Sequence, residues 1–438
     1  MKIKLICPTS YDLDNKLIKV DKATLPPLSI LYLAGLTPKE HDVKIVDECV
    51  QTIDFDEPVD LVGITSMTFT AKRAYQIADE YRKRHVTVIM GGIHASAMLE
   101  EALAHVDAVV IGEADNLWET VLEDIAKGEL KTTYQADQRP TLDNLPTPRF
   151  DLLDSTKYIR LPFRRSPNMP IQTARGCPHN CEFCSVSKFW GHKIRFRPIE
   201  EIVNEIELSK ADTFFFTDDN FVANPKRTLE LCQALIPLKI KYICQIDSLA
   251  FKTPDIIKAL SKSGCFMAFV GFESINRSTL ADISKSFNKP DNYPKLIRML
   301  HSNKINVYAS IILGFENDDP RTAEETARFL IDHKVGLASF FRVTPLPGTR
   351  MFEQLAKQGF LIDKRWWLKR GEGTQALVRY PENPYTGEQL TSIAMKHFYS
   401  WKSIFKRFFP FRAFYLDVLP FNYSSYKKVK AFSKTTVL

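Results

Sequence analysis

The sequence lacks any run of about 18 or more uncharged apolar residues, so we expect no helix long enough to span a bilayer. It also contains no fixed-period repeat, no low-complexity tract and no dedicated nucleic-acid-binding motif. A net charge of +7 over 438 residues is too small to indicate a nucleic-acid partner by itself. Residues 1–8 have only a short apolar run with no small-residue cleavage site, so we expect a strand there and no signal peptide.

The sequence also lacks the dense, even set of cysteines that secreted disulfide scaffolds carry. Its eight cysteines are scattered, except for three between residues 177 and 184. This pattern predicts a reducing, cytoplasmic compartment. Hydrophobic content of 45% and charged content of 25% are ordinary for a soluble globular protein, and the length favours two or three domains.

The first 135 residues alternate strand-like and helix-like segments. This alternation predicts an α/β domain with a doubly wound, Rossmann-like parallel sheet, whose ligands bind outside the carboxyl ends of the strands. The expected strands are residues 3–7, 43–47, 61–65, 86–90 and 108–111, and the expected helices are residues 28–36, 71–84 and 97–103.

A linker over residues 136–165 is expected to separate this domain from a second one over residues 166–358. Pro146 and Pro148 disfavour helix in the linker. Strand–helix alternation resumes after it, with helices such as 199–208 and 322–332. The expected strands are residues 171–174, 213–217, 242–246, 267–271, 307–313 and 339–343.

Residues 359–438 are expected to form a helical extension that is unusually rich in aromatic and basic residues, as in the segment 405–412. Three interpretations remain open for it. The extension could pack on the preceding domain with its basic residues solvated, cover a hydrophobic substrate tunnel, or lie as an amphipathic helix on an anionic membrane surface.

The most informative segment holds the three clustered cysteines, Cys177, Cys181 and Cys184. Three thiolates on one short loop can hold three irons of a [4Fe–4S] cube, and no fourth cysteine follows nearby. Clusters that only carry electrons normally have all four corners held by cysteine, so an open corner indicates chemistry at the cluster. Zinc is an alternative, because His179 and His192 lie within and just after the loop.

The spacing C-x-x-x-C-x-aromatic-C resembles the signature of the radical S-adenosylmethionine (SAM) enzymes. The resemblance implies that the open iron binds SAM and that an electron from the cluster cleaves SAM to a 5′-deoxyadenosyl radical. It also implies that residues 166–358 form a partial (β/α)6 barrel with the cysteines after its first strand. Phe183, the aromatic residue of the signature, is implied at the adenine end of SAM, with core packing as the alternative.

Further SAM-binding candidates lie where later strands of this domain end. Asp218 and Asp219 follow the second strand, where carboxylates could accept hydrogen bonds from the SAM ammonium. Helix capping is the alternative for this segment. Glu273 resembles the family position that contacts SAM, and Gln245, which ends the third strand, is expected to point toward the same mouth. Ser310 on the fifth strand is a weaker candidate.

Residues 1–135 resemble the cobalamin-binding domain that precedes the barrel in one large class of radical SAM enzymes. The Asp-x-His-x-x-Gly motif that supplies a lower histidine to cobalt is absent, which implies cobalt without that ligand. A flavodoxin-like domain that binds nothing is the alternative. The candidate cobalamin-binding residues follow three strands: Ser66, Met67, Thr68, Gly91, Gly92, His94, Gly112 and Glu113.

With its C-terminal extension, the chain resembles the subgroup that contains the hopanoid methylases. This resemblance implies a C-methyltransferase that moves a methyl group from methylcobalamin to an unactivated carbon after hydrogen abstraction by the 5′-deoxyadenosyl radical. Alternatives are a non-methylating cyclisation or ring contraction and, of another class, a non-catalytic cobalamin or redox sensor. The implied partners are a small-molecule or lipid-like substrate, or a peptide, and a reductant such as flavodoxin or ferredoxin, with peripheral membrane contact through the tail.

Overall fold

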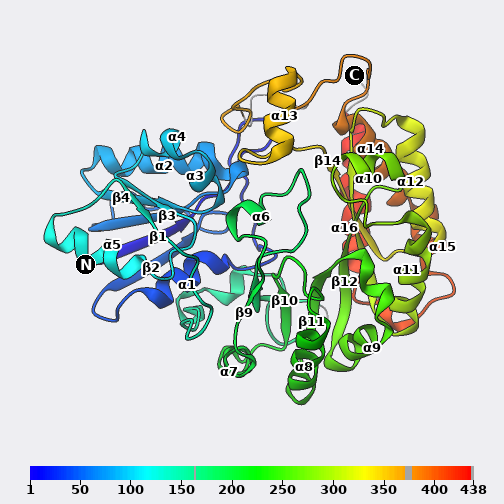
Figure 1. Ribbon diagram of the computed structural model, residues 1–438, viewed down its shortest axis with the longest axis horizontal. Coiled ribbons are helices and arrows are strands. Elements are labelled where there is room, and N and C mark those ends of the chain that lie inside the picture. Colours follow the sequence, from blue (N-terminus) through cyan, green and yellow to red (C-terminus); the bar gives the residue numbers. More distant parts are fainter. Residues whose placement is uncertain (162–163, 370–376, 436–438) are drawn as a thin grey trace.

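A computed structural model describes residues 1–161, 164–369 and 377–435. The predicted linker 136–165 and extension 359–438 therefore each include residues outside the described ranges. None of the helices in those ranges has the length and apolar character that a bilayer crossing requires. Figure 1 shows two α/β units side by side, with the helices of the C-terminal region against the second.

The N-terminal unit is a six-stranded parallel sheet with helices on both faces. The order β2-β1-β3-β4-β5-β6 places the first strand inside the sheet, as in doubly wound folds. Helices α1 and α5 cover one face, and α2 and α4 cover the other. The strands are β1 Lys2–Cys7, β2 Asp42–Asp47, β3 Leu61–Thr65, β4 Thr87–Gly91, β5 Ala108–Ile111 and β6 Thr133–Gln135. The helices are α1 Leu28–Leu36, α2 Ala71–Lys83, α3 Ile93–Ala97, α4 Leu99–Leu103 and α5 Trp118–Lys127.

The second unit is another six-stranded parallel sheet, in the order β14-β13-β12-β11-β10-β7. Its strands follow the chain from one edge to the other, with helices between them. The strands are β7 Met169–Ile171, β10 Thr213–Phe216, β11 Lys241–Ile246, β12 Cys265–Glu273, β13 Asn306–Leu313 and β14 Leu337–Arg342. The helices are α7 Ile199–Ser209, α8 Pro225–Leu235, α9 Pro254–Ser263, α10 Arg277–Asp282, α11 Tyr293–Ser302 and α12 Pro320–Asp332.

Local sequence explains where these elements begin and end. Helix α9 begins with Pro254, whose missing N–H costs nothing in a first turn, and it ends at Gly264. Gly264 has φ +108°, and a Cβ there would lie 2.1 Å from the Ile240 carbonyl oxygen, so only glycine fits the turn into β12. Helix α12 begins with a capping box formed by Asp319 and Thr322.

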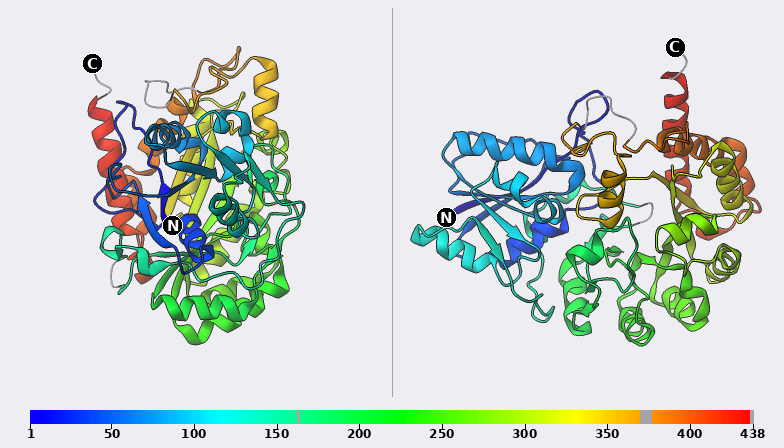
Figure 2. Two further views of the ribbon diagram at one scale, coloured as in Figure 1. Left: turned by 90° about the vertical axis from the view of Figure 1, so that its left-hand side faces the viewer. Right: turned by 45° about the horizontal axis from the view of Figure 1, so that its top comes forward.

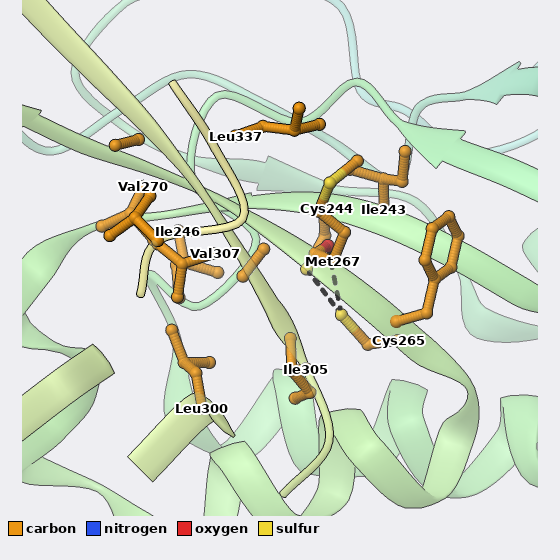
Figure 3. Packing of buried hydrophobic residues seen from close by; sticks show 14 of the residues in the cluster. Ile243, Cys244, Ile246, Cys265, Met267, Val270, Leu300, Ile305, Val307 and Leu337 are labelled. Carbon is orange, nitrogen blue, oxygen red and sulfur yellow. Dashed lines mark hydrogen bonds between the residues drawn. The ribbon is translucent and has the colours of Figure 1, made fainter. Parts of the chain in front are cut away.

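The core of the second unit is made where β11, β12 and β13 pack against their helices (Figure 3). Two of the scattered cysteines, Cys244 and Cys265, lie in this core with their sulfurs 3.8 Å apart. A disulfide needs about 2.05 Å between sulfurs, so these are buried thiols that pack as small apolar groups.

In the described part of the C-terminal region the helices are α13 Arg350–Gln358, α14 Gly387–Phe398, α15 Trp401–Phe408 and α16 Leu419–Thr435. Helix α14 packs against α12 and β14 and so extends the helical layer outside the sheet (Figure 2). Trp366 and Trp367 cross to the N-terminal unit, where the Trp367 indole donates to Glu101 at 2.8 Å. The extension therefore packs on both units.

The structure confirms the α/β fold class and corrects several boundaries. The first strand of the second unit is Met169–Ile171, and not residues 171–174. Two N–H groups there, of Thr173 and Ala174, donate to the Asp218 carboxylate at 2.6 and 2.7 Å, which ends the strand. The expected helix 97–103 is instead two short helices that meet at Met98. Helix α5 and strand β6 were not predicted from the sequence.

Candidate functional site

The three clustered cysteines lie on the loop between the first strand of a short antiparallel pair and helix α6. The pair is β8 Ala174–Arg175 with β9 Arg195–Phe196, and α6 is Val186–Phe189. Gly176, just before the first cysteine, has φ +105°, and a Cβ there would lie 2.7 Å from the Lys193 carbonyl oxygen. Glycine at this position therefore allows the loop to fold closely over the strand that follows it.

The thiols of this loop are free and close enough to influence one another. Burial raises the pKa of Cys177 to about 11. The His179 backbone N–H acts to lower this pKa, and the charges of Asp219 and Cys181 act to raise it. Burial, with smaller contributions from Cys181, Asp219 and Cys177, raises the pKa of Cys184 to about 12. Without metal the thiols are therefore protonated at neutral pH, and cluster assembly must release their protons.

This donor set does not fit a single metal ion. Within the described ranges, no three His, Cys, Asp or Glu side chains lie close enough together to hold one. A zinc ion needs ligands at about 2.0–2.3 Å from one point, whereas cysteines of an iron–sulfur cube bind different irons at its corners. Three thiols on one loop that do not converge on a single point fit the iron–sulfur cube. This arrangement argues against a zinc site.

Asp218 and Asp219, at the end of β10, differ in what their side chains do. The fully buried Asp218 carboxylate accepts from Thr173 and Ala174 and so braces the chain that leads into the cysteine loop. Burial raises the pKa of Asp218 to about 6 against the opposing effect of these donors. Burial and the Asp218 charge raise the pKa of Asp219 to about 7, and its charge acts on Cys177 and Cys184. Asp219 therefore lies where a cationic group at the cluster would be bound.

Glu273 ends β12 with a left-handed backbone, φ +64°, which is strained for a residue other than glycine. Its carboxylate accepts from Lys285 Nζ at 2.6 Å and from the Ser310 hydroxyl at 3.1 Å. Gln245 on the neighbouring strand β11 donates to the Asp218 carbonyl oxygen at 3.2 Å. The structure thus brings four candidate residues, Asp218, Gln245, Glu273 and Ser310, to neighbouring strands of one sheet.

Lys285 lies among the candidate residues but was not predicted from the sequence. Burial acts to lower the pKa of its ammonium, but Glu273 and the Cys181 and Cys184 thiols outweigh burial, so the pKa is raised. Its Nζ also lies 5.9 Å from the centre of the Phe183 ring. A buried cation beside two cluster thiols would offset the negative charge of a thiolate-bound cluster.

A buried ion-pair network joins the cysteine loop to the N-terminal sheet. Arg175 donates to Glu113 and to Asp115, both at 2.7 Å, and Arg195 donates to Glu113 at 2.6 and 2.9 Å. Glu113 follows β5, and Arg175 lies two residues before Cys177. The carboxyl edge of the N-terminal sheet is therefore held against the cluster loop through side chains that are almost fully buried.

A cavity of about 420 Å³ lies at this junction. Its walls come from α3, the segment after β5, the residues after β6, helix α6 and the turn at Gly348. Figure 1 shows α6 between the two sheets. The cavity is where a ligand at the carboxyl edge of the N-terminal sheet would meet the cluster loop.

The candidate residues after β3, β4 and β5 fit a large ligand at that edge. Met67 is 57% exposed, and the buried Ser66 hydroxyl has no hydrogen-bond partner among the described residues. Thr68 lies beside them, and Gly91 and Gly92 end the next strand. Gly112 has φ +79° with nothing within 4 Å of the place a Cβ would occupy, so the backbone there is open to a ligand.

The His94 side chain is engaged by the protein itself. Its ring is fully buried, and its two nitrogens lie 3.3 Å from the Thr68 hydroxyl and 3.1 Å from the Tyr75 hydroxyl. Glu113 is likewise engaged by Arg175 and Arg195. Both side chains are therefore held by protein partners, and Glu113 also lines the cavity.

Comparisons with known proteins decide the family. Residues 171–330 match the radical SAM superfamily, and residues 16–122 match the B12 binding domain. The chain is 33% identical to bacteriochlorophyllide d C-8(2)-methyltransferase of Chlorobaculum tepidum, over 77% of this chain and 78% of that protein. The chain belongs to the B12-binding radical SAM enzymes.

This radical SAM enzyme is a cobalamin-dependent methyltransferase, and its cofactors are a [4Fe–4S] cluster, SAM and cobalamin. It is also 25% identical to the hopanoid C-2 methylase of Rhodopseudomonas palustris, over 78% of this chain and 66% of that protein. Its fold resembles that of the radical SAM methyltransferase TsrM from Kitasatospora setae, with a TM-score of 0.65 and 16% identity over 90% of this chain and 85% of that one. The predicted family and cofactors are confirmed.

Proposed function

We propose that the enzyme methylates an unactivated carbon of a large, apolar, polycyclic small molecule. The observation that carries this proposal is the junction itself. Helix α6, which directly follows the loop of Cys177, Cys181 and Cys184, borders one cavity with the carboxyl edge of the N-terminal sheet, and Arg175 and Glu113 tie the loop to that edge. Such a junction keeps a methyl donor and a radical source at a fixed distance from one substrate.

Bound at these residues, the cluster and SAM would supply a 5′-deoxyadenosyl radical, and cobalamin would supply the methyl group. The three cysteines would hold the cluster, and Asp219 and Glu273 would accept hydrogen bonds from the SAM ammonium. Phe183 would pack near the adenine, since it lies between the last two cysteines. Met67 and the open backbone at Gly112 would face cobalamin.

The inner face of the second sheet supports an apolar substrate. Phe340 on β14 points outward, because its ring packs 5.8 Å from Phe398 of α14. Side chains alternate along a strand, so the neighbouring Phe341, which is 48% exposed, points inward. Tyr308 shares that face, since its hydroxyl lies 2.7 Å from the Ser339 hydroxyl, and the Phe269 ring lies 4.8 Å from the Tyr308 ring.

Two of the relatives support this substrate class. Their names specify bacteriochlorophyllide d and hopanoids, which are both large, mostly apolar ring systems. We further propose a reducing, cytoplasmic setting, because every cysteine is a free thiol, and a flavodoxin or ferredoxin as electron donor.

Transfer of an intact methyl group tests the proposal. The reconstituted enzyme would be given SAM with a fully deuterated methyl group, a strong reductant and either a chlorophyllide-type tetrapyrrole or a hopanoid. We expect one of these substrates to gain a methyl group that retains three deuterium atoms, as measured by mass spectrometry. A product that is cyclised or oxidised without the label would contradict methylation and favour the non-methylating alternative.

Two variants separate substrate binding from radical formation in the same assay. Phe341→Asp should lower substrate methylation by about tenfold or more while leaving substrate-independent SAM cleavage intact, because it charges an apolar wall. Leu208→Asp serves as the matched control, since Leu208 is 57% exposed on the outer helix α7. Equal loss of methylation in both variants would argue against the inner face as the substrate site.

A further inference from the structure

The positive charge of the chain is concentrated in its last 43 residues. Residues 396–438 contain nine of the 59 Lys and Arg residues but only one of the 52 Asp and Glu residues, Asp417. The rest of the chain then has 50 basic and 51 acidic side chains, so it is almost neutral. The net charge of +7 therefore belongs to one segment and not to the protein as a whole.

Helix α15 within this segment presents an outward stripe of aromatic side chains. Trp401, Phe405 and Phe409 are spaced four residues apart and are 63%, 67% and 62% exposed. The Phe405 and Phe409 rings stack on each other at 5.5 Å instead of turning inward. Phe411, 57% exposed, extends the stripe beyond the end of the helix. Large aromatic groups at helical spacing rarely face water on an isolated soluble surface.

The opposite side of α15 is anchored, which fixes the stripe outward. Arg407 is fully buried and donates to the carbonyl oxygens of Val335 and Gly336 at 2.9 Å and to the Asn422 side chain at 2.7 Å. Its guanidinium lies 3.9 Å from the centre of the Phe398 ring. The helix cannot rotate to bury its aromatic face without leaving these partners unsatisfied.

Helix α16 continues the same surface. The Trp401 ring lies 6.0 Å from the Tyr426 ring. Tyr423 is 51% exposed, and the Lys427 Nζ lies 4.6 Å from the centre of its ring. Basic residues flank the aromatic stripe on both helices. Lys402, Lys406, Arg412, Lys427 and Lys430 are all exposed.

The nearby acidic groups offset only part of this charge at the surface. Asp332 pairs with Lys406 at 2.6 Å, and Asp417 lies 3.7 Å from Arg164. Glu324 lies 3.7 Å from the His397 ring, to the side of the stripe. The aromatic face thus has a basic rim, which is the pattern of a helix that inserts at the headgroup level of an anionic bilayer.

We propose that the face formed by Trp401, Phe405, Phe409 and Phe411, with its basic rim, docks the enzyme on an anionic lipid surface. A second copy of the chain is the weaker occupant, because a symmetric contact would bring two sets of like charges together. The docked face lies on the C-terminal helices, outside the sheet that carries the cluster loop (Figure 1). Docking on this face leaves the cluster loop and the cavity at the domain junction uncovered.

Vesicle binding by the full, reconstituted chain tests this proposal. We expect the wild type to co-sediment with vesicles that contain phosphatidylglycerol and to bind pure phosphatidylcholine at least about tenfold more weakly. Binding should weaken as salt is raised, because the basic rim is solvent-exposed. Trp401 fluorescence should shift to shorter wavelength on binding, and the W401F variant should lose that shift.

Matched triple variants make the test specific to this face. W401S/F405S/F409S should bind anionic vesicles at least about tenfold more weakly than the wild type and keep its rate of SAM cleavage. The control L208S/L229S/I236S changes three exposed apolar residues on the outer helical layer and should bind like the wild type. Equal binding by all three proteins, equal binding to both vesicle types, or a wild-type dimer that only the α15 variant abolishes would overturn the proposal.

Discussion

Replacing Cys181 with alanine is expected to abolish formation of 5′-deoxyadenosine. Three cysteines on one loop leave the cluster no spare protein ligand, and burial at the site excludes water as a comparable substitute. Removal of a residue that acts only through a metal ligand typically lowers activity by about 10–100-fold. The loss of 5′-deoxyadenosine formation in Cys181→Ala should be much larger. The measurement is iron content and 5′-deoxyadenosine yield after anaerobic reconstitution, and Cys177→Ala and Cys184→Ala should behave alike.

Cys49→Ala is the matched control for this result. Cys49 is also a half-buried free thiol, but it follows β2 in the N-terminal unit. We expect it to retain the iron content and the SAM cleavage of the wild type. If Cys181→Ala kept a full cluster and cleaved SAM at the wild-type rate, the assignment of the loop as the cluster site would be wrong.

Lys285→Met is expected to lower the rate of SAM cleavage by about 10–100-fold and to make the cluster harder to reduce. Removing the ammonium leaves the Glu273 carboxylate buried without its partner and takes a positive charge away from Cys181 and Cys184. A more negative reduction potential follows, because the reduced cluster carries an additional negative charge. The measurement is a redox titration of the cluster together with the cleavage rate.

Two further variants distinguish an electrostatic role of Lys285 from a structural one. Lys285→Arg keeps the charge and should restore most of the potential, whereas Glu273→Gln should weaken SAM binding and shift the potential in the opposite direction. A Lys285→Met protein with an unchanged potential and a lower thermal stability would show that Lys285 only supports the fold.

The sequence predicted the parts of the site that are local in the chain. The cysteine loop spans eight residues, and Asp218, Gln245, Glu273 and Ser310 follow from strand periodicity, because parallel strands end at one edge. Lys285 was missed because it lies on an irregular segment that returns to the site after β12. The Arg175–Glu113 pair was missed because its partners are 62 residues apart in different units.

Local patterns also explain the errors in the fold. Residues 171–174 were predicted to form one strand, but the hydrogen bonds from Thr173 and Ala174 to Asp218 end it at Ile171. His94 was expected on a loop, whereas it lies in helix α3, where tertiary packing against Tyr75 and Trp367 buries it. Both outcomes depend on contacts from distant parts of the chain, which periodicity does not encode.

The most direct test of the account is the set of products that the enzyme makes from SAM. The reconstituted protein would be incubated anaerobically with SAM and a strong reductant, with and without hydroxocobalamin, and the products quantified by mass spectrometry. We predict 5′-deoxyadenosine together with S-adenosylhomocysteine that forms only when cobalamin is present. Formation of 5′-deoxyadenosine alone under both conditions would contradict the methyltransferase and leave a radical enzyme of another kind.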